Sequence, residues 1–244
     1  MASAYRLLRG DAVPHTVLTC EHATPLMPRK IRCSESQRRR LGEHWGWDRG
    51  AWDVCKELHA VLRAPAVGSR LSRLWIDLNR AIGDASMFRA EVGGVQLPWN
   101  DPPSITERRH RIDTVYRPYH DAIDRVLSDA LLRDGRPLVF SVHSFTSRLG
   151  RRRRAFDIGI LYHRSPAAAQ RMVRHFRQAG LRVRYNEPYS GREGMMYSAE
   201  RHAATFGLDC LELECNQELF KRVDASRRIA KIAGNALRQI HASR

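Results

Sequence analysis

Ionisable and polar side chains follow four short apolar segments of the sequence, where predicted strands end. They are Glu21-His22, Asp77-Leu78-Asn79-Arg80, His143-Ser144-Phe145 and Glu214. Ligands of open α/β sheets collect outside the carboxyl ends of the strands, so we expect these groups along one edge. Imidazole and carboxylate are suitable zinc ligands, and three of them plus an open position make a catalytic site. A lone histidine after a strand is usually structural, but several at matching strand ends favour a metal site, and the lack of cysteine among them favours catalysis.

The segment Ser72–Arg80, with the sequence SRLWIDLNR, is the richest of the four. Its apolar residues predict an extended, buried strand. Packing does not explain the polar groups that follow. A guanidinium beside an amide is a good receptor for a carboxylate, because both donate hydrogen bonds in fixed directions. Asn79 and Arg80 are therefore candidates for binding an acidic group, although an Asp77–arginine pair that only fixes the end of the strand explains the segment alone equally well.

Three further polar residues are interpreted as structural, or in the case of His44 and Asp48 as residues that support the ligands from behind, and not as ligands themselves. His44 and Asp48 are one helical turn apart, but Trp45-Gly46-Trp47 between them indicates the start of a helix, with Asp48 at its N-terminus. His120 lies on a predicted helix, where a partly buried histidine with a hydrogen-bond partner is the usual case. No glycine-rich phosphate loop, nucleophile elbow or dinucleotide-binding motif occurs in the sequence.

Predicted strands alternate with predicted helices along the chain. Strands are predicted at 16–20, 66–71, 72–80, 137–142, 156–162, 181–185 and 210–214. Helices are predicted from the capping boxes at Ser34 and Ser104, the second with a kink or break at Pro118, and over 48–63, 165–178 and 224–241. Residues 83–103 contain three glycines and three prolines and predict a long loop of the kind that covers a site.

This alternation predicts a three-layer α/β fold, with a mixed, mostly parallel central sheet and helices on both faces. Residues 1–244 are expected to form one domain, because neither a linker nor an internal repeat interrupts them.

Composition excludes several classes of protein. With 43% hydrophobic residues the chain can build a core, and it has no apolar run of about 18 residues that would cross a membrane. The first residues, MASAYRLLRG, lack the apolar stretch of a secretory signal, so we expect a cytoplasmic protein. The five cysteines are irregularly spaced without a CxxC pair, which predicts free thiols.

The chain is strongly basic, with 42 Lys+Arg against 26 Asp+Glu and a net charge of +16. The run Arg151-Arg152-Arg153-Arg154 is the most obvious patch that could bind nucleic acid. The other basic residues are spread over nearly every helix, and no zinc finger, helix-turn-helix or aromatic RNA motif accompanies them. We interpret the charge as a solvated, arginine-rich surface that could steer an anionic substrate.

Taken together, these motifs resemble the N-formylglutamate amidohydrolase family. The matching segments are Cys20-Glu21-His22-Ala23 with Pro28, His44 with Asp48-Arg49-Gly50-Ala51, Ser72–Arg80, Tyr116 with Pro118-Tyr119-His120, His143-Ser144-Phe145-Thr146, Asn186-Glu187-Pro188-Tyr189-Ser190-Gly191 and Leu213-Glu214. The resemblance implies a zinc-type hydrolase that splits N-formylglutamate into formate and glutamate. It also implies a phosphorylase/hydrolase-like fold similar to that of zinc carboxypeptidases and aspartoacylase.

The resemblance implies roles for individual residues. Zinc would be held by His22, His143 and Glu21, although the related enzymes space the first pair as His-x-x-Glu and here Glu21 and His22 are adjacent. Glu214 would be the general acid–base. By its spacing, Glu212 lies on the same strand face and could orient Arg73 or Arg80, and Asp77 could do the same. Arg73 would stabilise the oxyanion. The substrate carboxylates would be bound by Asn79, Arg80 and Ser144, with Arg148 or Arg192 as candidates for a second carboxylate.

Two alternative functions remain open. The chain could be a basic, nucleic-acid-associated protein on an inactive hydrolase scaffold, in which case its affinity for DNA or RNA would fall steeply with salt. It could also hydrolyse another N-acyl amino acid, because the loop at 83–103 is expected to shape the acyl pocket and its sequence does not specify the acyl group. The oligomeric state is not predicted.

Overall fold

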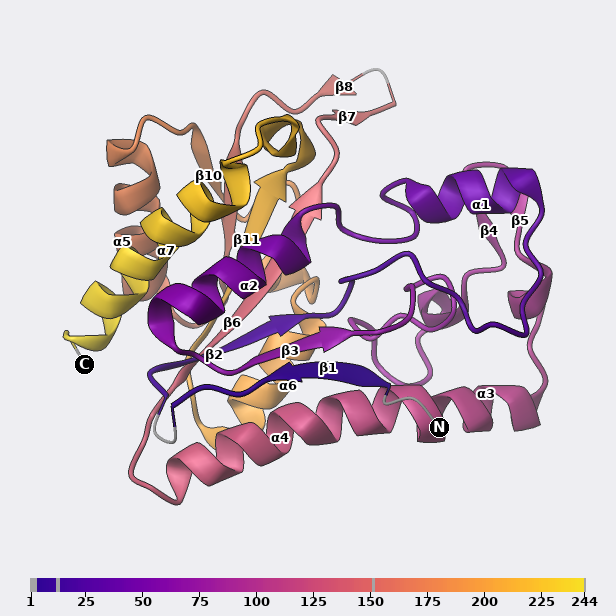
Figure 1. Cartoon of the computed structure of the whole chain (residues 1–244), viewed down its shortest axis with the longest axis horizontal. Helices are drawn as coiled ribbons and strands as arrows, with labels where there is room; N and C mark the ends of the chain where they lie inside the picture. The colour runs from indigo at the N-terminus through magenta and orange to yellow at the C-terminus, as the bar shows by residue number, and fades with distance from the viewer. Residues whose placement is uncertain (1–3, 12–13, 151, 244) are drawn as a thin grey trace.

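The computed structural model describes residues 4–11, 14–150 and 152–243, and it is built around a seven-stranded sheet (Figure 1). The strand order is β1-β3-β2-β6-β11-β9-β10. The bounds are β1 Tyr5–Leu8, β2 Thr16–Cys20, β3 Ala66–Ser69, β6 Leu138–Phe145, β9 Ile158–Leu161, β10 Val183–Tyr185 and β11 Cys210–Asn216. Met1–Ser3, in the segment used to predict localisation, and Arg151 of the arginine run lie outside the described residues.

Four central strands run parallel. β3 pairs with β2, β2 with β6, and β6 with β11, so the carboxyl ends of these strands share one edge of the sheet. β1 and β9 are antiparallel to their neighbours β3 and β11, and β10 is parallel to β9. The prediction of a mixed, mostly parallel sheet is confirmed.

Helices cover both faces of the sheet (Figure 1). α2 (Ala51–Leu62), α5 (Pro166–Gln178) and α7 (Ala225–His241) pack on one face, and α4 (Arg117–Leu131) and α6 (Tyr197–Phe206) pack on the other. The three-layer α/β architecture is therefore as predicted. No helix among the described residues is long and apolar enough to cross a membrane, and all five cysteines are free, as expected.

Alternation along β6 and β11 divides the two layers chemically. Side chains such as Phe140 and Leu213 enter the apolar core beneath α2, α5 and α7. The residues between them are polar, yet they are equally buried; they are Ser141, His143, Glu212 and Glu214. Because successive strand residues point to opposite faces, these four share the face towards α4 and α6. Buried ionisable groups are costly unless they are paired, so this end of the sheet is specialised for chemistry and not for packing.

The segment Ser72–Arg80 is not a strand, and the prediction of a strand there is wrong. It forms successive turns that follow β3, which itself ends at Ser69 and not at residue 71. Its backbone is satisfied by local and irregular hydrogen bonds in place of a ladder: Asn79 N–H donates to the Asp77 carboxylate at 2.9 Å, and Ser72 Oγ donates to the carbonyl of Gly46 at 2.7 Å. Short polar side chains compete with the sheet for backbone partners in this way.

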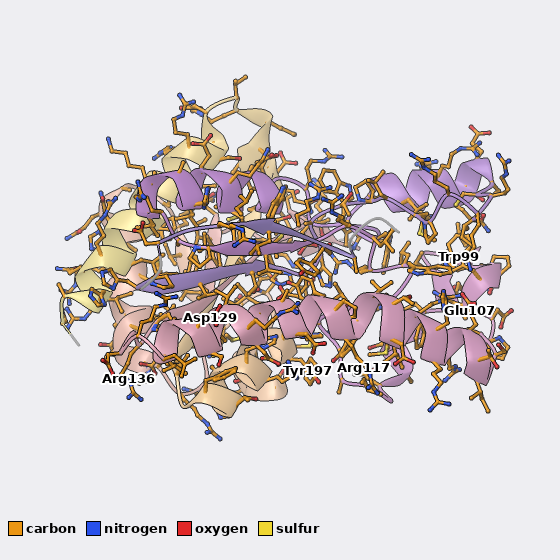
Figure 2. All side chains as sticks on the ribbon, turned by 60° about the horizontal axis from the view of Figure 1, so that its bottom comes forward. Trp99, Glu107, Arg117, Asp129, Arg136 and Tyr197 are labelled. Carbon is orange, nitrogen blue, oxygen red and sulfur yellow. The ribbon has the colours of Figure 1, made fainter. Side chains whose placement is uncertain are left out.

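The predicted loop at 83–103 contains short elements and is held in place by a buried arginine that follows it in the sequence. It includes the hairpin of β4 (Glu91–Val92) and β5 (Val95–Gln96), close to α1 (Glu35–Gly42). Arg111, with only 2% of its surface exposed, is the anchor. Its guanidinium donates to the carbonyls of Trp99 and Trp75, to the Asn100 side chain and to Glu107. Trp99 and Glu107 lie at the α3 end of the molecule in Figure 2.

The helix predicted from Ser104 runs through Pro118 without a break. α3 (Ile105–Arg111) passes into a π-helical turn, Ile112–Tyr116, and then into α4. The wider turn lies just before Pro118, where an ordinary α-helix would lose a backbone donor and meet the proline ring. The predicted kink is thus replaced by a local change in helical pitch.

The remaining elements differ in detail from their predicted bounds. The capping box at Ser34 is present, and the Ser104 side chain accepts from the backbone of Glu107 as expected. β6 extends to Phe145, so His143 lies within a strand and not after it. The elements that were not predicted include β1, α6, and the hairpin of β7 (Arg148–Leu149) and β8 (Arg152–Arg153).

Candidate metal and active site

A cleft of about 230 Å³ opens at the carboxyl ends of β2, β6 and β11. It brings together seven of the eight predicted site residues, which come from segments far apart in the sequence: His22, Arg73, Asn79, Arg80, His143, Ser144 and Glu214. A larger cavity of about 410 Å³ lies beside α6, but it contains no cluster of metal-ligating groups among the described residues. The chemistry is therefore concentrated at the smaller, polar cleft.

Three buried residues at the base of this cleft could hold a metal ion: His22, Asp48 and His143. Each offers one ligand atom, and these atoms lie within 4.8 Å of one another. Asp48 Oδ2 is 2.8 Å from His143 Nδ1 and 3.4 Å from His22 Nδ1. Asp48 was interpreted as an acid at a helix start. It does lie just before α2, but its side chain turns into the cleft, while Gly50, in a left-handed conformation with φ 81°, forms the helix N-cap.

Each imidazole of the cluster is oriented by a carboxylate behind it. His22 Nε2 is 2.8 Å from Asp77 Oδ1, and His143 Nε2 is 3.0 Å from Glu21 Oε2. If both Nε2 atoms carry the proton, both Nδ1 atoms can ligate an ion; without an ion, the 2.8 Å contact between His143 Nδ1 and Asp48 Oδ2 requires a second proton on His143. His22 Nδ1 is buried and has no hydrogen-bond partner, which is costly in a site with no other purpose. An outer carboxylate, an imidazole and a free inner nitrogen are the arrangement typical of metal-ligating histidines, so the residues present fit a metal ion.

Glu21 lies outside this cluster. Its Oε1 accepts hydrogen bonds from Tyr119 and Ser198, and its Oε2 accepts from Ser141 as well as facing His143. Burial alone would raise the pKa of Glu21, but the hydrogen bonds and the charge of His143 hold it well below its usual range. Both oxygens of the carboxylate are thus engaged within the protein, one of them with His143. Among the described residues the cluster contains Asp48 and does not contain the predicted ligand Glu21.

Two glutamates of β11 also line the cleft. Glu214 is opposite His143 in the strand register, and Glu212 Oε2 is 3.7 Å from His143 Nε2. Burial raises the pKa of Glu212 to about 7 and that of Glu214 to about 8. The Oε2 atoms of both are buried without a hydrogen-bond partner. Glu212 makes no ion pair with an arginine among the described residues, where its only ion pair is with His143.

The walls of the cleft carry four arginines: Arg73, Arg80, Arg89 and Arg154. Arg73 forms an ion pair with Asp48. Arg80 donates to Ser86 Oγ at 2.9 Å and to the carbonyl of Asn79 at 2.7 Å.

Arg89 is different, because its guanidinium has no ion pair or hydrogen bond with any described residue and its Nε is buried. It also lies close enough to Arg73 for its charge to lower the pKa of that residue, after the larger effect of burial. Two neighbouring cations in a cleft attract an anion.

The other residues predicted to bind substrate are placed as follows. Asn79 uses one amide N–H on the carbonyl of Met195 at 3.2 Å and its oxygen on Ser198 N–H at 2.9 Å, which leaves one N–H free. Ser144 Oγ donates to the carbonyl of Arg49 at 2.9 Å and accepts from Gln217. Arg148 and Arg192, predicted as candidates for a second carboxylate, do not line the cleft; Arg89 and Arg154 do.

Comparisons with known proteins identify the family and the fold of the chain. The family model of N-formylglutamate amidohydrolases matches residues 15–221. The crystal structure of the gene product Atu2144 from Agrobacterium tumefaciens is 28% identical over 99% of this chain and 96% of that chain, with a TM-score of 0.90. An N-formylglutamate amidohydrolase from Ralstonia eutropha JMP134 shares the fold at 17% identity and a TM-score of 0.73, over 99% and 98% of the two chains. No curated protein matches the sequence.

Proposed function

The chain belongs to the N-formylglutamate amidohydrolase family, and we propose that it is a zinc-dependent amidohydrolase that cleaves the acyl amide of an N-acyl amino acid. The proposed substrate is N-formyl-L-glutamate, and the products are formate and L-glutamate. The observation that supports this proposal is the His22–Asp48–His143 cluster at the base of a cleft walled by arginines. We further propose that residues 1–244 act as one domain in the cytoplasm, where free thiols persist.

His22, Asp48 and His143 would hold the zinc ion, with Asp77 and Glu21 fixing the two imidazole rings from behind. When bound, such an ion supplies Lewis acidity, which polarises an acyl carbonyl and makes water more acidic. Glu21 is thus reassigned from ligand to orienting group.

Glu214 is the proposed general acid–base. Its unpartnered Oε2 lies in the cleft beside the cluster, where it can take the proton of the attacking water and return it to the leaving amine. Arg73 holds Asp48 through one nitrogen and has a buried Nε without a partner. This N–H is available to the oxyanion that develops as the amide carbonyl is attacked.

The remaining polar groups would bind the two carboxylates of the substrate. Arg80, with the free N–H of Asn79, would take the α-carboxylate and so aim the acyl carbonyl at the cluster. Arg89, which has no partner within the described protein, would take the side-chain carboxylate. Ser144 forms part of the cleft wall beside Asp48, and its backbone N–H lies 3.3 Å from Asp48 Oδ2.

Metal analysis combined with a substrate screen tests the proposal. We expect about one zinc per chain and release of acid from N-formyl-L-glutamate in preference to N-acetyl and N-succinyl amino acids. Asp48→Ala should lose the metal, whereas Glu21→Gln should weaken metal binding by roughly 10- to 100-fold, as expected for an outer partner. A purified chain that holds metal but hydrolyses no N-acyl amino acid would contradict the proposed activity. Retention of metal by Asp48→Ala with loss from Glu21→Gln would restore Glu21 as the ligand.

A further inference from the structure

A chain of hydrogen bonds links two buried histidines that the proposed mechanism does not use. Asp124 Oδ1, on α4, is 2.5 Å from His202 Nδ1, on α6. His202 Nε2 is 2.9 Å from His120 Nδ1, and His120 Nε2 is 3.1 Å from the carbonyl oxygen of Leu78. Both imidazoles are essentially inaccessible to solvent, with 1% and 0% of their surface exposed. α4 and α6 lie side by side on one face of the sheet (Figure 1).

The groups at the two ends of this series of hydrogen bonds fix the number of protons that the two imidazoles must carry. The Asp124 carboxylate and the Leu78 carbonyl can only accept, so both outer bonds need an imidazole N–H. Two neutral imidazoles supply two N–H groups in total. If both are used on the outer bonds, two lone pairs face each other across the central 2.9 Å contact, which is repulsive. All three bonds form only when the pair carries one additional proton.

The additional proton belongs on His202, because its neighbour Asp124 supplies the compensating negative charge. Burial alone would raise the pKa of Asp124, but its hydrogen bond to His202 holds that pKa below its usual value. Burial and the neighbouring His202 lower the pKa of His120 to about 3, which agrees with a neutral His120.

One other cation faces the pair and opposes a charge on His202. Arg201 Nη1, on α6, lies 3.2 Å from His202 Nδ1 and 3.3 Å from His202 Nε2, so the Asp124 carboxylate must offset the repulsion between the two. The rings of Tyr116 and Tyr119 also face the pair, as does the carboxylate of Glu21 at longer range. Arg201 Nη2 lies 3.2 Å from the second oxygen of Asp124, so Asp124 serves both cations.

This series of hydrogen bonds ends at Leu78, in the segment that carries active-site groups. Leu78 stands between Asp77, which orients His22, and Asn79-Arg80, which line the cleft. We infer that His202 is an imidazolium, and that Asp124, His202 and His120 are positioning residues that fix the Leu78 carbonyl and thereby the segment Asp77–Arg80. The kinetic test of this inference relies on the proposed hydrolysis, but the test of the number of protons on the two histidines does not.

Nitrogen NMR of the protein labelled with ¹⁵N-histidine tests the proton count without any substrate. At neutral pH His202 should show two protonated nitrogens, and His120 should be neutral with its proton on Nε2. In Asp124→Asn the imidazolium loses its counter-ion, so His202 should become neutral. A neutral His202 in the wild-type protein would overturn the inference, whether or not the chain hydrolyses N-formyl-L-glutamate.

Kinetics test the positioning role. Asp124→Asn should lower kcat/KM for N-formyl-L-glutamate by about tenfold, the lower end of the effect of outer partners, and should move the alkaline limb of the pH profile to lower pH. Asp124→Glu should restore both. Asp129→Asn, on the exposed side of α4 (Figure 2), is the matched control and should change neither.

An imidazolium in the wild type combined with unchanged kinetics in Asp124→Asn would overturn the positioning role alone. If Asp124→Asn does not fold, the wild-type spectrum still decides the proton count, and Asp124→Glu supplies the kinetic comparison: a pH profile that does not move would then overturn the role.

Discussion

Replacement of Arg89 by methionine should greatly weaken the proposed preference of the enzyme for substrates with two carboxylates. Methionine keeps an unbranched stem of similar length and removes the charge and the hydrogen-bond donors. The backbone should hold its position, because the carbonyl of Arg89 accepts from Asn100 Nδ2 at 2.9 Å and Asn100 is held in turn by Arg111. Among the described residues the wild-type guanidinium has no hydrogen-bond or ion-pair partner, so its removal leaves none of their buried groups unpaired.

The size of the effect follows from the contact that is lost. A hydrogen bond to a charged group contributes about 1.5–3 kcal/mol. Converted to rate, this corresponds to a loss of roughly 10- to 150-fold in kcat/KM for N-formyl-L-glutamate. N-formyl-L-glutamine has the same shape but no side-chain charge, so its kcat/KM should change little. The ratio of the two substrates should therefore fall by nearly the full factor.

The assay compares kcat/KM for both substrates in the wild type, in Arg89→Met and in Arg109→Met. Arg109 is an exposed arginine of α3, so its replacement controls for the loss of one positive charge from the chain. An equal loss for both substrates would mean that Arg89 only supports the structure of the cleft. An unchanged preference for glutamate would assign the side-chain carboxylate to another cation, with Arg154 the next candidate in the same cleft.

Three further changes test separate parts of the structure. Glu214→Gln should lower kcat by roughly 10²-fold or more with an unchanged metal content; full activity would exclude it as the acid–base. Arg111→Met should lower the free energy of unfolding by about 3–5 kcal/mol in denaturant titrations, because it leaves several buried acceptors unpaired, and a loss below 1 kcal/mol would refute the anchoring role. His120→Gln should flatten the acid side of the stability curve. Because the pKa of His120 is lowered to about 3, the unfolded chain binds the additional proton first, so wild-type stability should fall as the pH drops from about 6.5 towards 3. An equally steep fall in the variant would contradict this.

The sequence was sufficient to locate the edge of the sheet where the site lies. β2 and the first half of β6 are short, mostly apolar segments, and such segments predict buried strands whatever their neighbours are. Since parallel strands place their carboxyl ends together, His22 and His143 could be assigned to one cleft without knowing the strand order.

The position of Asp48 in the cleft could not be predicted from the residues around it in the sequence. At the start of a predicted helix an aspartate is usually an N-terminal cap, and nothing in the pattern Trp47-Asp48-Arg49-Gly50 contradicts that. Its approach to His143 depends on how the turn before α2 meets β6, some 95 residues away. The one available signal was that Asp48 falls within a segment shared with the family.

Arg89 and Arg111 could not have been distinguished from the other arginines. In so basic a chain an arginine is expected on almost any surface, and only tertiary contacts separate a buried anchor such as Arg111 from an unpaired cation such as Arg89. The strand prediction for Ser72–Arg80 was wrong for a related reason. Its composition favours a strand, but its partners are side chains from a distant helix, which no local pattern reports.

The contacts between the segment Ser72–Arg80 and that helix also explain why the helix contains a π-turn. Arg111 donates to the carbonyl of Trp75 at 3.0 Å, Tyr116 Oη to that of Arg80 at 3.0 Å, and His120 Nε2 lies 3.1 Å from that of Leu78. Residues five apart do not share a face of an α-helix, but they do across a π-turn, and Ile112–Tyr116 is such a turn. The additional residue brings Arg111 into line with Tyr116 and His120, so one helical rod can bind three carbonyls of an irregular segment. A strand would have satisfied those carbonyls itself, and its neighbours would have occupied the positions from which Asp77 and Arg80 now reach the cleft.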